Sequence, residues 1–392
     1  MPWIVVPSGG CGGNSLPASC TLTTTPLEGN ALTLMSDARM DLVGAGFVLL
    51  GTDGANVLWE TIDVIGTAGP LLTVALPTHT DGPWFGVVGT AASPGSQVVV
   101  VYAANPAGGM ASLMSFAVGI DGTAPTAPAA IGMIPDRGSM TAQLLVSAGS
   151  GQAGQHAGLM WAIKGTSTVS AKVLGPNGTQ VGADVTLGSV DDIDCPRFAP
   201  GQEDLTATYV KTAGTPPVQT LVAREFKADG SPDTTLNLGL ADWSADEAMG
   251  CVAIAPAMPG YGLAWRANTG SFSGDYFTVF DPTTGGAYLP AQILSDERVA
   301  GGIAPPIVGV AKAGKRYILL LARTSGGEAR EVDFQGHQVA QTLTFPSAQG
   351  NTGTFTSQPL GNSLFASYAD YSSTVSTDHT AGSRLFAQVS CN

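Results

Sequence analysis

Charged side chains are scarce in this chain of 392 residues, where Asp, Glu, Lys and Arg together make up 12%. The usual share in soluble proteins is about twice as large. Basic residues are the scarcer kind, because 16 Lys and Arg stand against 30 Asp and Glu, and the formal net charge is −14. We expect no binding to nucleic acid or to an anionic membrane surface, since both need a basic patch.

Long apolar runs and extended helical patterns are also missing. No run approaches the roughly 18 apolar residues that cross a bilayer, so we expect no transmembrane segment. The 52 Gly and 26 Pro residues favour an all-β chain with many turns. The Lys-poor surface, rich in Ser, Thr and Gly, favours export, to the periplasm, the outer surface or the medium.

Catalytic signatures are few. The chain has only 4 His residues, none at a fixed spacing from a Ser or Cys nucleophile, and no Gly-x-Ser-x-Gly segment. Cleavage of a polysaccharide by paired carboxylates stays open, because neighbours in space cannot be seen in one sequence.

What the chain does contain is a repeat. Seven stretches resemble one another at intervals of about 50 to 56 residues, a period typical of radial arrays and solenoids. Each has an apolar strand bounded by turn residues, such as residues 47–52, 98–103 and 205–210. Turn glycines recur at the same period, at Gly66, Gly122, Gly178, Gly230, Gly286 and Gly336. Four strands in each of seven units predict an all-β fold, a seven-bladed β-propeller with four-stranded blades. A stack of two β-sandwiches is the alternative.

The two ends of the chain predict how the ring closes. Residues 20–27 resemble a fourth strand, and residues 384–391 resemble a third strand. We expect the N-terminal strand to complete the last blade, which would leave no open sheet edge. Residues 1–19 would then form an N-terminal extension, and residues 20–392 a single propeller domain.

The repeats resemble those of secreted bacterial seven-bladed β-propeller repeat proteins, in which a strand is followed by Asp-x-x-Gly or Asp-Gly. The best local match is Ala-Arg-Glu-Phe-Lys-Ala-Asp-Gly at residues 223–230. The resemblance covers nearly the whole chain, although its motif is short. It implies a fold and export, and it implies no activity.

Five cysteines fall at informative positions. Cys20 and Cys391 lie on the two strands expected to close the ring, and Cys195 and Cys251 lie one period apart on innermost strands of neighbouring blades. We expect the disulfides Cys20–Cys391 and Cys195–Cys251, with buried free thiols as the alternative for both pairs. Cys11 is free, pairs with Cys20 instead, or carries a lipid anchor.

Candidate binding residues gather in the segments that join one repeat to the next. Six of these seven segments contain aspartate, and the seventh contains Ser347; the aspartates are Asp37, Asp81, Asp136, Asp191, Asp192, Asp242, Asp246 and Asp296. A ring of carboxylates at one mouth of a propeller would attract a basic partner or a hydrated cation. Calcium is the one candidate cofactor, since oxygen ligands suit it better than zinc. Ordinary turn chemistry of aspartate is the alternative.

A long polar segment, residues 370–383, is expected on the same face and carries Tyr371, Asp378 and His379. Together these features predict a non-catalytic, exported binding module at the cell surface, which recognises a protein, a glycan or a cation. A structural subunit of an extracellular assembly, docking through the apolar residues 3–7, is the alternative. An enzyme acting on polysaccharide is a third hypothesis.

Overall fold

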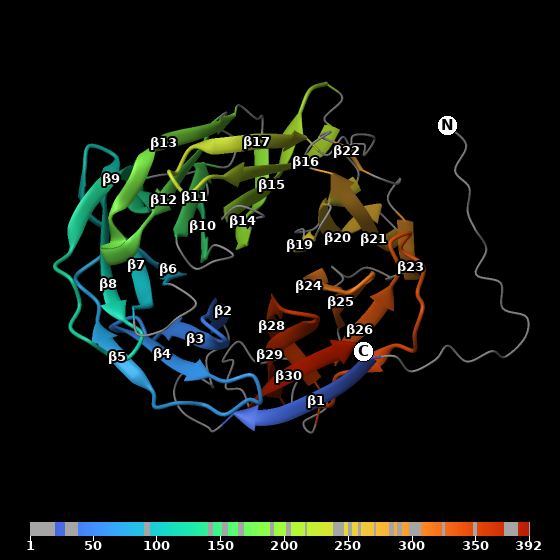
Figure 1. Cartoon of the computed structure of the whole chain (residues 1–392). Coiled ribbons are helices and arrows are strands. Elements are labelled where there is room, and N and C mark those ends of the chain that lie inside the picture. The colour runs from blue at the N-terminus through green and yellow to red at the C-terminus, as the bar shows by residue number, and fades with distance from the viewer. Residues whose placement is uncertain are drawn as a thin grey trace, which may run out of the picture.

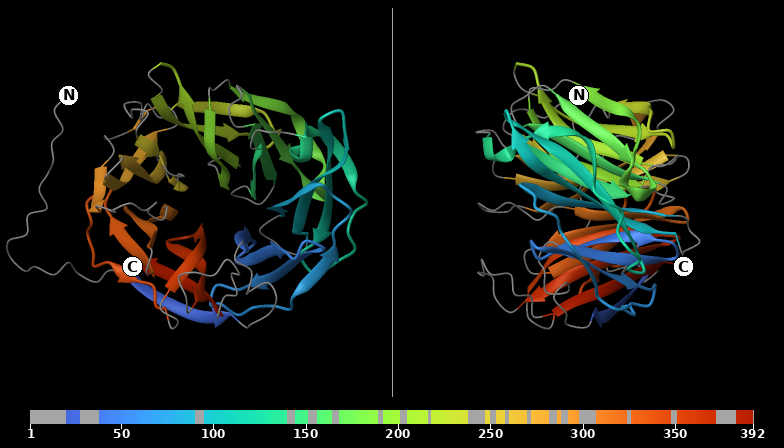
Figure 2. Two further views of the ribbon diagram at one scale, coloured as in Figure 1. Left: turned by 180° about the vertical axis from the view of Figure 1, so that it is seen from behind. Right: turned by 90° about the vertical axis from the view of Figure 1, so that its left-hand side faces the viewer.

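Apolar strands separated by Gly and Asp turns form seven antiparallel sheets arranged in a ring around a central axis (Figure 1). This computed structural model describes residues 20–27, 38–89, 95–139, 144–150, 156–163, 168–188, 192–200, 205–215, 218–237, 247–249, 253–257, 260–269, 272–281, 286–287, 292–297, 307–323, 326–347, 351–371 and 383–391. The first strand of each sheet lies nearest the axis and the last lies on the outer rim, as Figures 1 and 2 show. The predicted seven-bladed β-propeller is therefore confirmed, and the two-sandwich alternative is wrong.

The first three blades are regular four-stranded sheets. The first contains β2 (Arg39–Val43), β3 (Gly46–Thr52), β4 (Asn56–Ile62) and β5 (Leu72–Ala75). The second contains β6 (Asp81–Val88), β7 (Gln97–Ala107), β8 (Met110–Gly119) and β9 (Ala129–Pro135), and the short 3-10 turn η1 (Arg137–Ser139) follows it. The third contains β10 (Leu144–Ser150), β11 (Ala157–Ile163), β12 (Val169–Leu174), the 3-10 turn η2 (Pro176–Gly178) and β13 (Gln180–Gly188).

The other four blades follow the same order. The fourth contains β14 (Asp192–Pro200), β15 (Leu205–Ala213), β16 (Val218–Phe226) and β17 (Pro232–Asn237). In the fifth, β18 (Glu247–Met249) and β19 (Ala253–Ala257) share one side of β20 (Gly260–Thr269), while β22 (Gly286–Ala287) and β23 (Gln292–Glu297) share one side of β21 (Phe272–Asp281). The sixth contains β24 (Ile307–Ala313), β25 (Arg316–Arg323), β26 (Gly326–Val332) and β27 (Leu343–Thr344). The seventh contains β28 (Asn351–Leu360), β29 (Ser363–Tyr371), β30 (Ser383–Cys391) and β1 (Cys20–Leu27).

The seventh blade joins the two ends of the chain. β1 pairs antiparallel with β30 along its whole length, from Cys20 opposite Cys391 to Leu27 opposite Arg384. Figure 1 shows β1 along the outer rim beside the C-terminal strands. Cys20 and Cys391 form a disulfide between residues 371 positions apart. The predicted closure and this predicted disulfide are both confirmed.

The core lies between blades. The apolar residues of β3 and β4 pack against those of β7 and β8, and the same arrangement recurs around the ring. Val98, Val99 and Val100 are fully buried, because the second strand of each blade has a neighbouring sheet on both faces. These short continuous apolar runs therefore form strands that are buried on both sides.

The Asp-x-x-Gly and Asp-Gly segments are the turns between third and fourth strands. Gly66 has a φ of 88°, and its N–H donates to the carbonyl of Asp63. Gly230 has a φ of 77°, and its N–H donates to the carbonyl of Lys227. Both positions need glycine, since other L-residues rarely adopt such a φ. Gly286 differs from the expected turn glycine, since it begins the short strand β22.

These turns also connect neighbouring blades. Their carbonyl groups accept hydrogen bonds from side chains of the preceding blade: Thr25 Oγ1 donates to Ile65, Trp59 Nε1 to Ile120, and Ser115 Oγ to Gly178. The repeated turn thus satisfies polar groups on both sides of the interface between two blades, and the bonds of Trp59 and Ser115 are buried.

Within the part of the chain that the structure describes, no helix is long and apolar enough to cross a membrane.

Candidate functional site

The first strands begin, and the second strands end, on one face of the ring, which we call the loop face. Asp81 and Asp192 begin the first strands β6 and β14, Asp136 lies just before η1, and Asp296 lies near the end of β23. Tyr371 is the last residue of β29, at this same face. The other predicted binding residues lie outside the described residues: Asp37, Asp191, Asp242, Asp246, Asp378 and His379.

Asp81 and Asp136 are the two predicted carboxylates with described surroundings, and both have partners within the protein. Oδ2 of Asp81 lies 2.7 Å from Nε of Arg137, whose Nη2 also donates to the carbonyl of Leu144 at 3.2 Å. Oδ1 of Asp136 accepts the N–H of Gly138 at 3.3 Å. Arg137 therefore ties the second blade to the third, and a cation binding at Asp81 would compete with this guanidinium.

A buried polar cluster lies at the ends of β29 and β30, which border the long segment that begins at Asp370. Ser347 Oγ donates to Oδ1 of Asp370 at 2.6 Å, and Tyr368 Oη donates to the carbonyl of Pro346 at 2.9 Å. Arg384 Nη1 donates to Ser367 Oγ at 3.3 Å. Asp370 is 1% exposed and Arg384 is fully buried. We call these five side-chain positions, Ser347, Ser367, Tyr368, Asp370 and Arg384, the loop base.

The loop base holds both ends of the long segment, because Asp370 pairs with Ser383 across β29 and β30. It also holds the crossover from the sixth blade, through Pro346 and Ser347. Burial, and then the negative charge of Asp370, raise the pKa of Tyr368, so its hydroxyl stays protonated and donates. The described residues on either side of the segment that carries Tyr371, Asp378 and His379 are thus held in place by buried hydrogen bonds.

Most of the loop base has no clear signal in the sequence. The inter-blade position of Ser347 predicts that it lies on the loop face, whereas no repeat or motif marks Arg384 or Ser367. One signal was present, since a charged residue at the start of an otherwise apolar strand is unusual unless it is paired.

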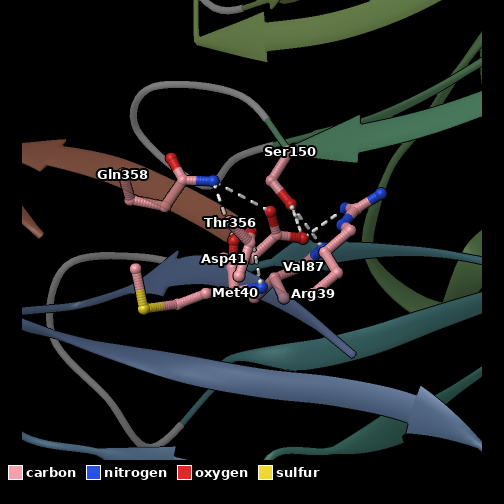
Figure 3. Close-up of polar contacts among 7 residues, drawn as sticks. All are labelled: Arg39, Met40, Asp41, Val87, Ser150, Thr356 and Gln358. Atoms are coloured by element: carbon pink, nitrogen blue, oxygen red, sulfur yellow. Dashed lines mark hydrogen bonds and ion pairs between the residues drawn. The ribbon is translucent and has the colours of Figure 1, made fainter. Parts of the chain in front are cut away.

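A second polar cluster joins four first strands, as Figure 3 shows for Arg39, Asp41, Ser150, Thr356 and Gln358. Asp41 is 3% exposed. Its Oδ2 accepts from Ser150 Oγ at 3.0 Å and pairs with the guanidinium of Arg39, and its Oδ1 accepts from Gln358 Nε2 at 3.2 Å. A guanidinium from β2, a hydroxyl from β10 and an amide from β28 therefore meet at one carboxylate.

The same cluster caps backbone groups on the inner edges of the blades. Gln358 Nε2 donates to the carbonyl of Met40 at 3.0 Å, and the N–H of Met40 donates to Thr356 Oγ1 at 3.0 Å. The N–H of Val87 in β6 donates to Ser150 Oγ at 2.7 Å. An inner edge strand has no further strand to pair with, so these side chains replace the missing partners. We therefore interpret this axial network as a structural connection between blades.

One group of metal-ligating residue types lies close together among the described residues, namely Cys20, Glu331 and Cys391. The two sulfur atoms are bonded to each other, so no thiolate is present there to bind a cation. Cys195 belongs to β14, but Cys251 and Cys11 lie outside the described residues, and so does the predicted bond between Cys195 and Cys251.

No known family profile and no curated protein sequence matches this chain. Among solved structures, a polysaccharide lyase is similar with a TM-score of 0.52 and 9% identity, covering 98% of this chain and 94% of the lyase. A prolyl endopeptidase has a TM-score of 0.49 and 12% identity over 92% of this chain, which spans about half (51%) of that enzyme. Hydrazine synthase of Kuenenia stuttgartiensis has a TM-score of 0.49 and 11% identity, covering 93% of this chain and 97% of that one. At these identities the similarity concerns the fold alone, and by its fold the chain is a seven-bladed β-propeller closed by its N-terminal strand.

Proposed function

We propose that this chain is an exported binding module at the cell surface, which recognises a protein, a glycan or a cation through its loop face. The loop base carries this proposal. Burying an aspartate and an arginine costs free energy unless both are hydrogen-bonded, and here their bonds to Ser347 and Ser367 fix the two ends of a long polar segment. Fixing both ends in this way reduces the entropy lost when the segment binds a partner.

Three further features support the proposal. The net charge of −14 favours a basic partner or a cation over an anionic one. The disulfide between Cys20 and Cys391 is typical of an oxidising compartment, which agrees with export. Tyr371, Asp378 and His379 offer an aromatic ring, a carboxylate and an imidazole on one segment, the types of groups that bind sugars and peptides.

Binding can be tested with three probes: a glycan array, calcium chloride and an oligolysine peptide. We expect the wild-type chain to bind at least one of them, and Tyr371→Ala and Asp378→Asn to weaken that binding at least tenfold. Asp121→Asn is a control of equal charge change, because Asp121 lies in a turn on the opposite face, where it accepts the N–H of Thr123. The proposal is wrong if no probe binds, or if all three variants lose binding equally.

A structural role is the second candidate, favoured by exposed apolar residues in the turn after β4. The side chain of Ile65 is 71% exposed and that of Val64 is 38% exposed. Sedimentation velocity should then show concentration-dependent association that Ile65→Ser removes. A wild-type chain that stays monomeric at high concentration would contradict this role.

A further inference from the structure

The disulfide that closes the ring lies against a buried carboxylate of the neighbouring blade. Oε2 of Glu331, on β26, lies 2.9 Å from the sulfur of Cys20. The Glu331 side chain is 2% exposed, and its other carboxylate oxygen, Oε1, pairs with Nη1 of Arg316, whose side chain is 45% exposed. The sulfur of Cys20 carries no proton in the disulfide, so this contact is not a hydrogen bond.

The two cysteines differ in their exposure to solvent. Cys20 is 7% exposed and packs with Leu320, Ala329 and Val389 between the sixth and seventh blades. Cys391 is only partly buried, at the outer end of β30. An external thiolate can therefore reach Cys391, whereas Cys20 is covered.

We propose that Cys391 is the site of thiol exchange in this protein, and that Glu331 slows the exchange by opposing negative charge on the sulfur of Cys20. The attacking thiolate forms a new sulfur–sulfur bond to Cys391. The bond between Cys391 and Cys20 breaks, and its electron pair leaves with Cys20 as a thiolate, which then takes a proton from water. The products are a mixed disulfide at Cys391 and a thiol at Cys20.

The charge that develops on Cys20 lies beside the carboxylate of Glu331, in a site screened little by water. Repulsion at this distance raises the barrier, because a leaving thiolate that is destabilised leaves more slowly. Arg316 acts in the opposite sense, since its positive charge partly offsets Glu331. Glu331 therefore slows the cleavage of the disulfide that closes the ring, and Arg316 speeds it. Both residues act through their charge.

Two substitutions separate this mechanism from simple loosening of the fold. We expect Glu331→Gln to be reduced by dithiothreitol about tenfold faster than the wild-type chain, and Arg316→Gln to be reduced severalfold more slowly. Rates are followed by quenching with an alkylating reagent and counting labelled Cys20 and Cys391 by peptide mass spectrometry. Because the label is counted on the peptides of Cys20 and Cys391 alone, any reaction of Cys11, Cys195 or Cys251 does not affect the measured rates.

Two further measurements complete the test. With a monothiol such as glutathione, the first adduct should appear on the peptide that contains Cys391. In concentrated guanidinium the wild-type chain and both variants should be reduced at one common rate, because in the unfolded chain Glu331 and Arg316 no longer lie beside the disulfide. Acceleration by both substitutions would indicate loosening and would overturn the proposal, as would equal rates in the folded state or an adduct found first on Cys20.

Discussion

At the scale of single residues, the turn glycines serve two purposes that can be separated by experiment. Gly66 and Gly54 have nearly equal φ values, 88° and 87°. A Cβ atom at Gly66 would lie 2.8 Å from Cβ of Thr25, whereas a Cβ atom at Gly54 would have no neighbour within 4 Å. Gly66 therefore combines a backbone requirement with close packing against the seventh blade, and Gly54 has the backbone requirement alone.

We expect Gly54→Ala to lower the free energy of unfolding by about 1 kcal/mol through backbone strain. Gly66→Ala should lower it by about 3 kcal/mol, because overpacking adds to the same strain. Urea unfolding at equilibrium measures both values. Equal losses would show that packing against Thr25 contributes nothing.

The turn aspartates predict a loss of stability in acid. Hydrogen bonds from the side chain and then the backbone of Ser231 hold the pKa of Asp229 below its ordinary value of 3.8. A carboxyl group with a lowered pKa in the folded state stabilises the fold above the unfolded value, and this contribution is lost as pH falls through the folded value. Asp229→Asn keeps an acceptor oxygen and removes only the titration.

The wild-type chain should therefore have a higher Tm than Asp229→Asn near pH 5, and the difference should disappear as pH falls below about 3.8. Thermal unfolding followed by circular dichroism at closely spaced pH values measures it. A difference that stays constant down to acid pH would rule out this titration as its source.

At the scale of strands, equivalent tyrosines hold the crossovers between blades. Tyr368 in β29 and Tyr209 in β15 occupy matching positions and donate to the carbonyls of Pro346 and Leu187. Tyr102 occupies the matching position in β7, and among the described residues its ring contacts His79 edge-on. Removing the hydroxyl should thus have different effects in different blades.

We expect Tyr368→Phe and Tyr209→Phe each to cost about 1 kcal/mol, the net value of one buried hydrogen bond, and Tyr102→Phe to cost less. Equilibrium unfolding in urea gives the three values. Tyr368→Phe should in addition increase hydrogen exchange at Ser347 and its neighbours, since the loop base loses one of its bonds. Identical behaviour of the three variants would contradict a special role for these hydroxyl groups.

The axial network makes a second prediction at this scale. Ser150→Ala should cost about 2 kcal/mol, because it leaves the N–H of Val87 without its acceptor and removes one donor from Asp41. Ser363→Ala is the control, since Ser363 Oγ bonds Ser390 Oγ across β29 and β30 in a partly buried position and its loss should cost below about 0.5 kcal/mol. Equal costs in urea unfolding would count against a role of the network in joining blades.

At the scale of the whole molecule, ring closure depends on one strand pairing and one covalent bond between distant positions. The pair of substitutions Cys20→Ser and Cys391→Ser should lower the free energy of unfolding by about 6 kcal/mol, the nominal value of the entropic model for a loop between residues 371 positions apart. Urea unfolding should also show a steeper dependence on denaturant, because the unfolded chain becomes more expanded. A loss below about 1 kcal/mol would show that the pairing of β1 with β30 suffices by itself.

Much of the fold could be predicted because it depends on local and periodic features. Apolar runs such as residues 98–103 identify the second strands, and turn glycines such as Gly66 and Gly230 mark the ends of the third strands. The similarity of residues 20–27 to a fourth strand was enough to predict the closure and its disulfide. Asp81 and Asp136 were placed on the loop face, but their bonds to Arg137 and Gly138 depend on how that segment folds.

The sequence by itself determined the number of blades, their strand order and the way the ring closes. These features depend on the repeat, the apolar strands and the turn residues, which are local patterns along the chain. Only the tertiary structure decided which polar groups meet: Asp41 with Ser150 and Gln358, Asp370 with Ser347, and Glu331 with Cys20. Several of these partners are hundreds of residues apart, and no periodic signal connects them. They come together because a closed ring brings each blade against the next, and a buried charge is tolerated only where the fold supplies a partner for it.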